Sequence, residues 1–240
     1  MGDTNGVPEH EEAFQEAFAR IEAAVDAGDT DLSKLGFWRL VRRVKLDPAL
    51  AHDWAEQVGR IDRKAFEARV HPRFPVWFGN LVLLLGTTVG AAAVVVAMGT
   101  ADAPVAGLAL VVAAVAWSIS LHDLGHWAVG RLVGIRFVAY FVGGPFPPRP
   151  GLKTDYATYL RTSPSARASM HASGALVTKA APFVVLGFWW STEAPAWAGW
   201  AVLAIGVVQI VTDVLFSTKT SDWKKVARER RIARAQLSRR

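Results

Sequence analysis

Four long stretches of this chain contain almost no charged residue, and they follow a densely charged segment over residues 1–73. A helix needs roughly 20 consecutive apolar residues to cross the hydrocarbon layer of a bilayer, and each stretch is about that long or longer. The sequence therefore predicts an all-α integral membrane protein with about four transmembrane helices. The four predicted spans are Val76–Met98, Val105–Gly134, Ala172–Trp190 and Trp197–Phe216.

The basic residues of the predicted loops gather on one side of this arrangement. The connection Gly99–Pro104 and the turn around Glu193 contain no lysine or arginine, whereas both residue types are frequent before the first span, between the second and third, and after the fourth. Because positively charged loops stay in the cytoplasm, we expect both termini to be cytoplasmic. Arginine outnumbers lysine and alanine is abundant, which favours a prokaryotic cell membrane. The net charge of +6 mostly reflects the loop asymmetry, and we expect the basic tail to lie against anionic lipid rather than to bind nucleic acid.

The segment before the first span is predicted to form a helical cytoplasmic arm. Apolar residues recur at helical spacing over residues 8–27, and two shorter helices are expected to follow, the last beginning at Asp47-Pro48. These helices either pack as a small cap or form a loosely packed, solvated arm. The expected organisation is a helical region at 1–73, a transmembrane domain at 74–226 and a basic tail at 227–240.

The connection between the second and third spans has the composition of a short β-hairpin. Ile135–Val142 is rich in β-branched and aromatic residues, and Gly143-Gly144-Pro145 then breaks regular structure. Tyr156–Arg161 is the expected partner strand.

A polar cluster interrupts the second predicted span. His122 and His126 are four residues apart, so they project from one face of a helix and can reach one metal ion with bonds of roughly 2.0–2.1 Å. With Asp123, three ionisable groups lie within five residues at membrane depth, where such groups are costly and usually mark a functional site. The alternative is that the cluster only forms hydrogen bonds to neighbouring helices.

A catalytic zinc ion usually has three protein ligands and one water, so a third ligand is expected. Asp213 lies near the end of the fourth span and Asp222 just beyond it, and both are candidates. His171 is expected to be an interfacial residue. Lys179 is expected to extend to the interface, with an ion pair to Asp213 or Asp123 as the alternative.

The sequence around these histidines resembles the site-2 protease family of intramembrane zinc metalloproteases. His122-Asp123-Leu124-Gly125-His126 is similar to the family's H-E-x-x-H motif, with aspartate at the glutamate position. Val142-Gly143-Gly144-Pro145 resembles the Gly-Gly turn that follows. Ser173–Thr178 resembles the family's small-Gly-Pro-x-x-Asn pattern without its proline and asparagine. The segment from Asp213 to Asp222 resembles the final N-x-x-P and Asp-Gly element, and the whole resemblance covers about residues 105–226.

This resemblance implies zinc-dependent intramembrane proteolysis of a membrane-anchored protein. It implies that His122, His126 and Asp222 bind Zn²⁺, with Asp213 as the alternative third ligand. Asp123 takes the role of the acid that moves a proton during catalysis. Val142, Gly143 and Gly144 are expected to bind an extended substrate by strand addition.

Aspartate at position 123 leaves a second interpretation open. Its carboxylate sits roughly 1.5 Å further back than that of glutamate, and a misplacement of about 1 Å can cost ~100-fold in rate. The chain is then a zinc-binding membrane protein with a regulatory or binding role. A third hypothesis is a four-helix membrane protein in which the polar cluster is structural. The expected partners are a membrane-embedded substrate and the lipid bilayer, and the oligomeric state is left open.

Overall fold

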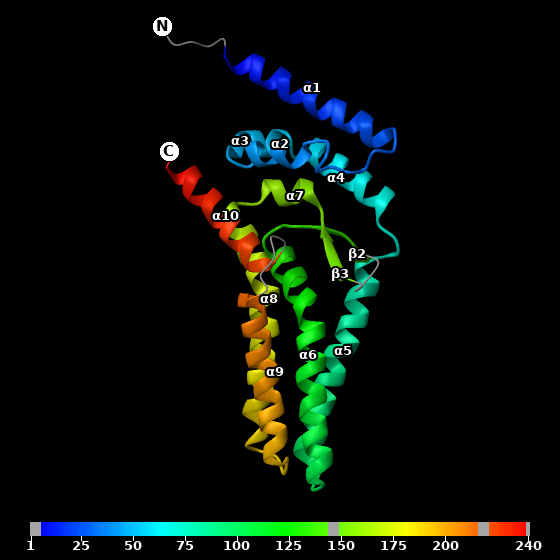
Figure 1. The fold of residues 1–240 in the computed structure, drawn as a ribbon, viewed down its shortest axis with the longest axis vertical. Coiled ribbons are helices and arrows are strands. Elements are labelled where there is room, and N and C mark those ends of the chain that lie inside the picture. The colour runs from blue at the N-terminus through cyan, green and yellow to red at the C-terminus, as the bar shows by residue number, and fades with distance from the viewer. Residues whose placement is uncertain (1–5, 144–148, 216–220, 239–240) are drawn as a thin grey trace. The chain divides into compact units, whose positions relative to one another are not determined.

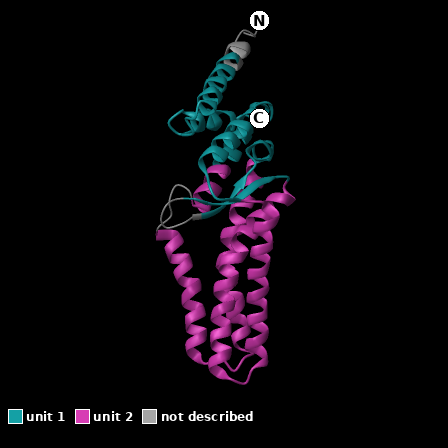
Figure 2. Ribbon diagram, turned by 90° about the vertical axis from the view of Figure 1, so that its right-hand side faces the viewer, with its two compact units in different colours: residues 1–73, 134–163, 231–240 teal, residues 74–133, 164–230 magenta. Residues whose placement is uncertain are grey.

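The computed structural model describes residues 6–143, 149–215 and 221–238 (Figure 1). The chain divides into two compact units, each built from segments that are distant in sequence (Figure 2). Unit 1 comprises residues 1–73, 134–163 and 231–240, and unit 2 comprises residues 74–133 and 164–230. The segment between the second and third spans therefore belongs to the same unit as the N-terminal region.

Unit 2 contains four helices that are long and apolar enough to cross a membrane, as the sequence predicts. The structure ends the fourth at Leu215, and Phe216, the predicted last residue, lies outside the described residues. Helix α6 packs against α5, α8 and α9, and α8 also packs against α9 (Figure 1). The helices are α5 (Val76–Gly99), α6 (Ala103–Leu132), α8 (Pro164–Trp189) and α9 (Ala196–Leu215), and the unit also includes the first part of α10 (Asp222–Leu237).

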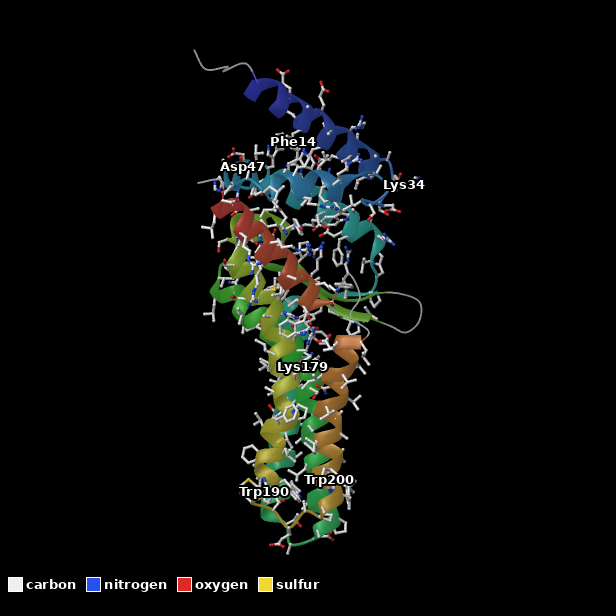
Figure 3. All side chains as sticks on the ribbon, turned by 60° about the vertical axis from the view of Figure 1, so that its left-hand side comes forward. Phe14, Lys34, Asp47, Lys179, Trp190 and Trp200 are labelled. Carbon is white, nitrogen blue, oxygen red and sulfur yellow. The ribbon has the colours of Figure 1, made fainter. Side chains whose placement is uncertain are left out.

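The outer surface of these helices is apolar. Val95, Leu108 and Ile119 each expose more than half of their side chains, while small residues such as Ala97 and Ala113 are fully buried between the helices. Soluble monomeric proteins rarely expose contiguous apolar surface of this kind. Trp190 and Trp200 are exposed at the end of the bundle where α8 connects to α9, and tryptophans are enriched at membrane interfaces (Figure 3).

Helix α6 is longer than a hydrocarbon layer requires. Its 30 residues extend over roughly 45 Å at 1.5 Å per residue. It begins at the N-cap Asp102, whose Oδ1 accepts a hydrogen bond from the Val105 amide at 3.0 Å. Because both histidines lie in the second half of this helix, they are nearer to the end of the bundle opposite that cap.

Among the described residues, unit 1 contains five complete helices with a common apolar core, and the last part of α10 also belongs to it. The stripe predicted on the first helix (Phe14, Phe18, Ile21 and Val25) is buried in this core. Asp47 caps α3 by accepting a hydrogen bond from the Ala49 amide at 2.8 Å, as its position before proline predicts. The helices are α1 (Gly6–Asp26), α2 (Phe37–Val44), α3 (Pro48–Asp53), α4 (Ala55–Arg69) and α7 (Tyr156–Arg161).

An ion pair joins two helices of unit 1. Arg60 Nε of α4 donates to Glu22 Oε1 of α1 at 2.7 Å. The hydrogen bond from Arg60 lowers the pKa of Glu22 to about 2, although partial burial of the carboxyl opposes that shift.

A small sheet completes the described fold. Strands β1 (Arg73–Phe74), β2 (Phe137–Gly143) and β3 (Arg149–Thr154) lie in the order β1-β2-β3, and β2 and β3 are antiparallel. The prediction that Tyr156–Arg161 pairs with the first strand is wrong, because this segment is helix α7. Asp155 caps that helix by accepting a hydrogen bond from the Ala157 amide at 3.1 Å, which ends the extended chain before Tyr156.

Candidate metal centre

Three potential metal ligands meet within unit 2. His122 and His126 project from one face of α6, and Asp222 is the first residue of α10. Oδ2 of Asp222 lies 3.2 Å from Nε2 of His126 and 3.5 Å from Nε2 of His122. One ligand atom from each of the three residues lies within 4.8 Å of the other two. The structure therefore brings together the two histidines that the sequence predicts and one of its two candidate aspartates.

The outward-facing nitrogen of each imidazole is held by α8. Nδ1 of His126 lies 2.7 Å from the Met170 carbonyl oxygen, which can only accept, so Nδ1 must carry a proton. Nδ1 of His122 lies 2.9 Å from Oγ1 of Thr178, whose own proton is donated to the Gly174 carbonyl at 2.8 Å. Thr178 must therefore accept from His122. When both rings are neutral, each therefore directs an Nε2 lone pair toward the space beside Oδ2 of Asp222.

This donor arrangement fits a divalent cation. A neutral imidazole protonated at Nδ1 has no proton at Nε2 to donate to the carboxylate. A cation between the two Nε2 atoms and Oδ2 of Asp222 would accept a lone pair from each of them. In a tetrahedral site with bonds of 2.0–2.1 Å, neighbouring ligand atoms are about 3.3 Å apart; the two distances from Asp222 Oδ2 to the histidines, 3.2 Å and 3.5 Å, are close to this value, and the three ligand atoms all lie within 4.8 Å of one another. Two histidines and one carboxylate leave a coordination position for water or substrate, and this donor set suits zinc and also ferrous iron.

The carboxylate of Asp222 is held on its other side as well. Nζ of Lys225, one turn further along α10, donates to Oδ1 of Asp222 at 2.9 Å. Burial raises the pKa of Asp222, whereas the charge and the hydrogen bond of Lys225 lower it. Lys225 therefore holds Oδ1 and leaves Oδ2 facing the histidines.

Two glycines allow α6 and α8 to approach closely at this site. A Cβ added at Gly174 would overlap the ring of His126 and would lie 2.7 Å from the carbonyl oxygen of His122. A Cβ added at Gly125 would lie 3.2 Å from Cα of Gly174. Oγ of Ser173 shares its proton between the Met170 carbonyl at 2.7 Å and the Gly125 carbonyl at 2.9 Å, so it contacts both helices. The imidazole of His126 thus occupies space that a side chain at position 174 would fill, and the backbones of the two helices are in contact at Gly125.

Asp213, the alternative third ligand, has different partners. Its Oδ2 lies 2.7 Å from Nζ of Lys179, which confirms the alternative prediction of an ion pair between these two residues (Figure 3). The same oxygen accepts a hydrogen bond from Nε1 of Trp223 at 2.7 Å. These contacts connect α9 to α8 and to α10.

The remaining predicted site residues do not join the ligand group. Asp123 is partly buried next to His122, but its carboxylate is not among the ligand atoms that converge. The ring of His171 is centred 6.5 Å from that of His126 and is also outside the group. Val142 and Gly143 end β2 in unit 1, and Gly144 lies outside the described residues.

Sequence reasoning missed the residues that orient the ligands. Met170, Gly174 and Thr178 are spaced by four residues along one face of α8, and each contacts a histidine or orients a residue that does. The spacing of Gly174 and Thr178 is visible in the sequence. The role of Met170 is not, because its carbonyl is a group that every residue carries.

Comparison of the chain with protein-family models, with curated proteins and with solved structures finds no match.

Proposed function

We propose that this protein is a zinc-dependent intramembrane protease that resembles the site-2 protease family. The observation that carries this proposal is the convergence of His122, His126 and Asp222 at one end of a bundle of four apolar helices. Two imidazoles and one carboxylate with an open position are a ligand set of zinc hydrolases. The position of the histidines on a long apolar helix suits a substrate that is itself embedded in the bilayer.

The roles of the residues follow from their positions. A bound zinc ion supplies Lewis acidity toward a water molecule and toward the peptide carbonyl. His122, His126 and Asp222 hold the ion, and Met170 and Thr178 keep both imidazoles in the tautomer that can bind it. Asp123 accepts the proton of the attacking water and returns it to the leaving amine.

The substrate must be extended before it is cleaved, because a hydrogen-bonded helix hides its carbonyl groups. Strand β2 lies between β1 and β3, and β1 covers only part of it, since β1 has two described residues and β2 has seven. We propose that Val142, Gly143 and Gly144 bind the extended segment by strand addition, in which the segment replaces the contact of the Val142 amide with the Pro72 carbonyl.

The proposed location is a prokaryotic cell membrane with both termini in the cytoplasm. The connection between α5 and α6 and the connection between α8 and α9 contain no lysine or arginine. The opposite ends of these helices are followed or preceded by basic segments. The positive-inside rule then places the end of the bundle that carries the histidines toward the cytoplasm.

The alternative is a zinc-binding membrane protein with a regulatory or binding role. The aspartate at position 123 favours this alternative, because its carboxylate is shorter than that of glutamate and sits roughly 1.5 Å further back. Binding of the metal needs only the three ligands, whereas hydrolysis also needs a proton acceptor close to the bound water.

A cleavage assay with Asp123 variants separates the two functions. The purified protein is reconstituted in liposomes with a library of single-span membrane peptides, and the products are identified by mass spectrometry. For a protease, Asp123→Glu raises the rate of cleavage and Asp123→Asn abolishes it, while both variants keep their zinc. Zinc binding without any cleavage by the parent protein or by Asp123→Glu would contradict proteolysis and support the alternative.

A further inference from the structure

Helix α10 supplies Asp222 to the metal centre. Two turns further along, the same helix forms a deeply buried ion pair with α8. Oε2 of Glu229 lies 2.8 Å from Nε of Arg167 in α8. The side chain of Glu229 is fully buried and that of Arg167 is 1% exposed. Lys179 and Asp213, by comparison, remain 20% and 25% exposed.

One face of α10 carries both the ligand and this ion pair. Asp222, Val226 and Glu229 are spaced by four and three residues, which places them on one side of a helix. Val226 is 4% exposed, so the side chain between the two carboxylates is also buried. Seven residues of helix separate the carboxylates by roughly 10 Å along the axis. A shift of α10 by one residue would turn Asp222 away from the histidines by about 100°.

One face of α8 carries the matching contacts. Arg167 precedes Met170 by three residues, and Met170 precedes Gly174 by four. Met170 orients His126, and Gly174 makes room for its ring. The residue that binds α10 and the residues that position the histidines are thus parts of one rigid helix.

We propose that the Arg167–Glu229 ion pair fixes the register of α10 against α8 and so holds Asp222 beside the two imidazoles. Arg167 and Glu229 are positioning residues, because neither touches the metal centre. A buried charge without its partner is very unfavourable, so arrangements of α10 that separate this pair are disfavoured. The metal-binding part of this inference rests on the proposed function, whereas the placement of α10 does not.

The test uses a variant that removes both charges together. Arg167→Met/Glu229→Leu replaces the pair with apolar side chains and leaves no buried charge unpaired, a change that proteins often tolerate. We expect the full-length variant in detergent to remain helical and to bind Zn²⁺ about 10–100-fold more weakly than the parent. The visible spectrum of bound Co²⁺ should change to that of Asp222→Asn. Binding of Zn²⁺ with parental affinity would overturn the proposal.

Combination with Asp222→Asn distinguishes positioning from general damage to the fold. If the ion pair acts through Asp222, removing it from the Asp222→Asn protein causes no further loss of affinity. Two losses that multiply would show that the pair acts elsewhere, and would also overturn the proposal. Arg167→Gln/Glu229→Gln, which also removes both charges but keeps polar side chains, serves in the same cycle if the first double variant does not fold.

A distance measurement tests the placement of α10 without any metal. The chain contains no cysteine, so Leu176→Cys and Ala227→Cys introduce two exposed sites for spin labels on α8 and α10. We expect one narrow distance distribution in the parent and a broad or shifted one in Arg167→Met/Glu229→Leu. An unchanged distribution would overturn the proposal. A parent protein that binds no metal but shows the expected broadening would reject the proposed function and leave the placement of α10 intact.

Discussion

Gly174→Ala should disrupt the candidate metal centre by adding a single methyl group. The new Cβ would overlap the ring of His126 and lie 2.7 Å from the His122 carbonyl, whereas ordinary contacts begin near 3.4 Å. The helices must therefore separate by roughly 0.7 Å. Overpacking of this kind costs about 1–3 kcal/mol, while replacing glycine with alanine in a helix stabilises it by about 1 kcal/mol. We expect a net destabilisation of about 1 kcal/mol and a loss of zinc affinity of about 10–100-fold.

Helix α8 also provides the matched control. A Cβ added at Gly187 would meet no atom within 4 Å, so Gly187→Ala keeps the gain in helix stability without the overlap. This variant should melt at the same or a higher temperature than the parent and bind zinc normally. The assay is zinc titration with a competing chelator, with thermal melting followed by circular dichroism. Equal zinc affinities for Gly174→Ala and Gly187→Ala would refute the close packing of α6 and α8 at the histidines.

Three other changes test separate contacts. Thr178→Val removes the hydrogen-bond acceptor for Nδ1 of His122. It should weaken zinc binding about 10–100-fold with little change in melting temperature. An unchanged zinc affinity in the titration would contradict the tautomer assigned to His122. Lys179→Met and Asp213→Asn should each destabilise the bundle by about 1–3 kcal/mol, and the combined variant should recover much of the loss in detergent unfolding; additive losses would argue against the ion pair. The pKa of Glu22 is about 2 in the folded state and near 4.5 when unfolded, so the ionised carboxylate contributes about 1 kcal/mol to stability above pH 4.5, and this contribution is lost as the pH falls toward 2. Glu22→Gln should therefore lower the melting temperature at pH 7 and make it depend less on pH between 4.5 and 2; an unchanged pH dependence would contradict the ion pair.

The long helices could be predicted because their constraint is local. A run of about 20 apolar residues, as in α5 or α9, rarely forms anything other than a transmembrane helix, and the thickness of the bilayer sets the length of that helix. The buried stripe of α1 and the Asp47 cap of α3 were also readable, because each depends on neighbours within one or two turns. These features need no knowledge of which helix packs against which.

The short segment after β3 shows where such local reasoning fails. Tyr156–Arg161 has the composition of a strand but forms α7, because Asp155 caps a helix there and the residues Arg149–Thr154 pair with β2 instead. Composition over six residues is a weak signal, and tertiary pairing decides the outcome.

The candidate site could be predicted only in part, because tertiary packing decides several of its contacts. The spacing of His122 and His126 marks one helix face, but the distance between Asp222 and either histidine depends on how α10 packs. The resemblance favours Asp222 over Asp213, but only the three-dimensional structure brings the Asp222 carboxylate beside both histidines. The ion pair of Lys179 with Asp213 and the buried pair of Arg167 with Glu229 are contacts between helices that no spacing rule reveals.

Metal content gives the most direct test of the central claim that His122, His126 and Asp222 form one metal site. The full-length protein, purified in detergent after growth in metal-replete medium, is measured by inductively coupled plasma mass spectrometry. We expect about one zinc per chain in the parent and in Asp213→Asn, and almost none in His122→Ala/His126→Ala or Asp222→Ala. A parent protein without stoichiometric metal, or one whose zinc survives loss of both histidines, would contradict the account, and stoichiometric iron would reject zinc as the resident metal.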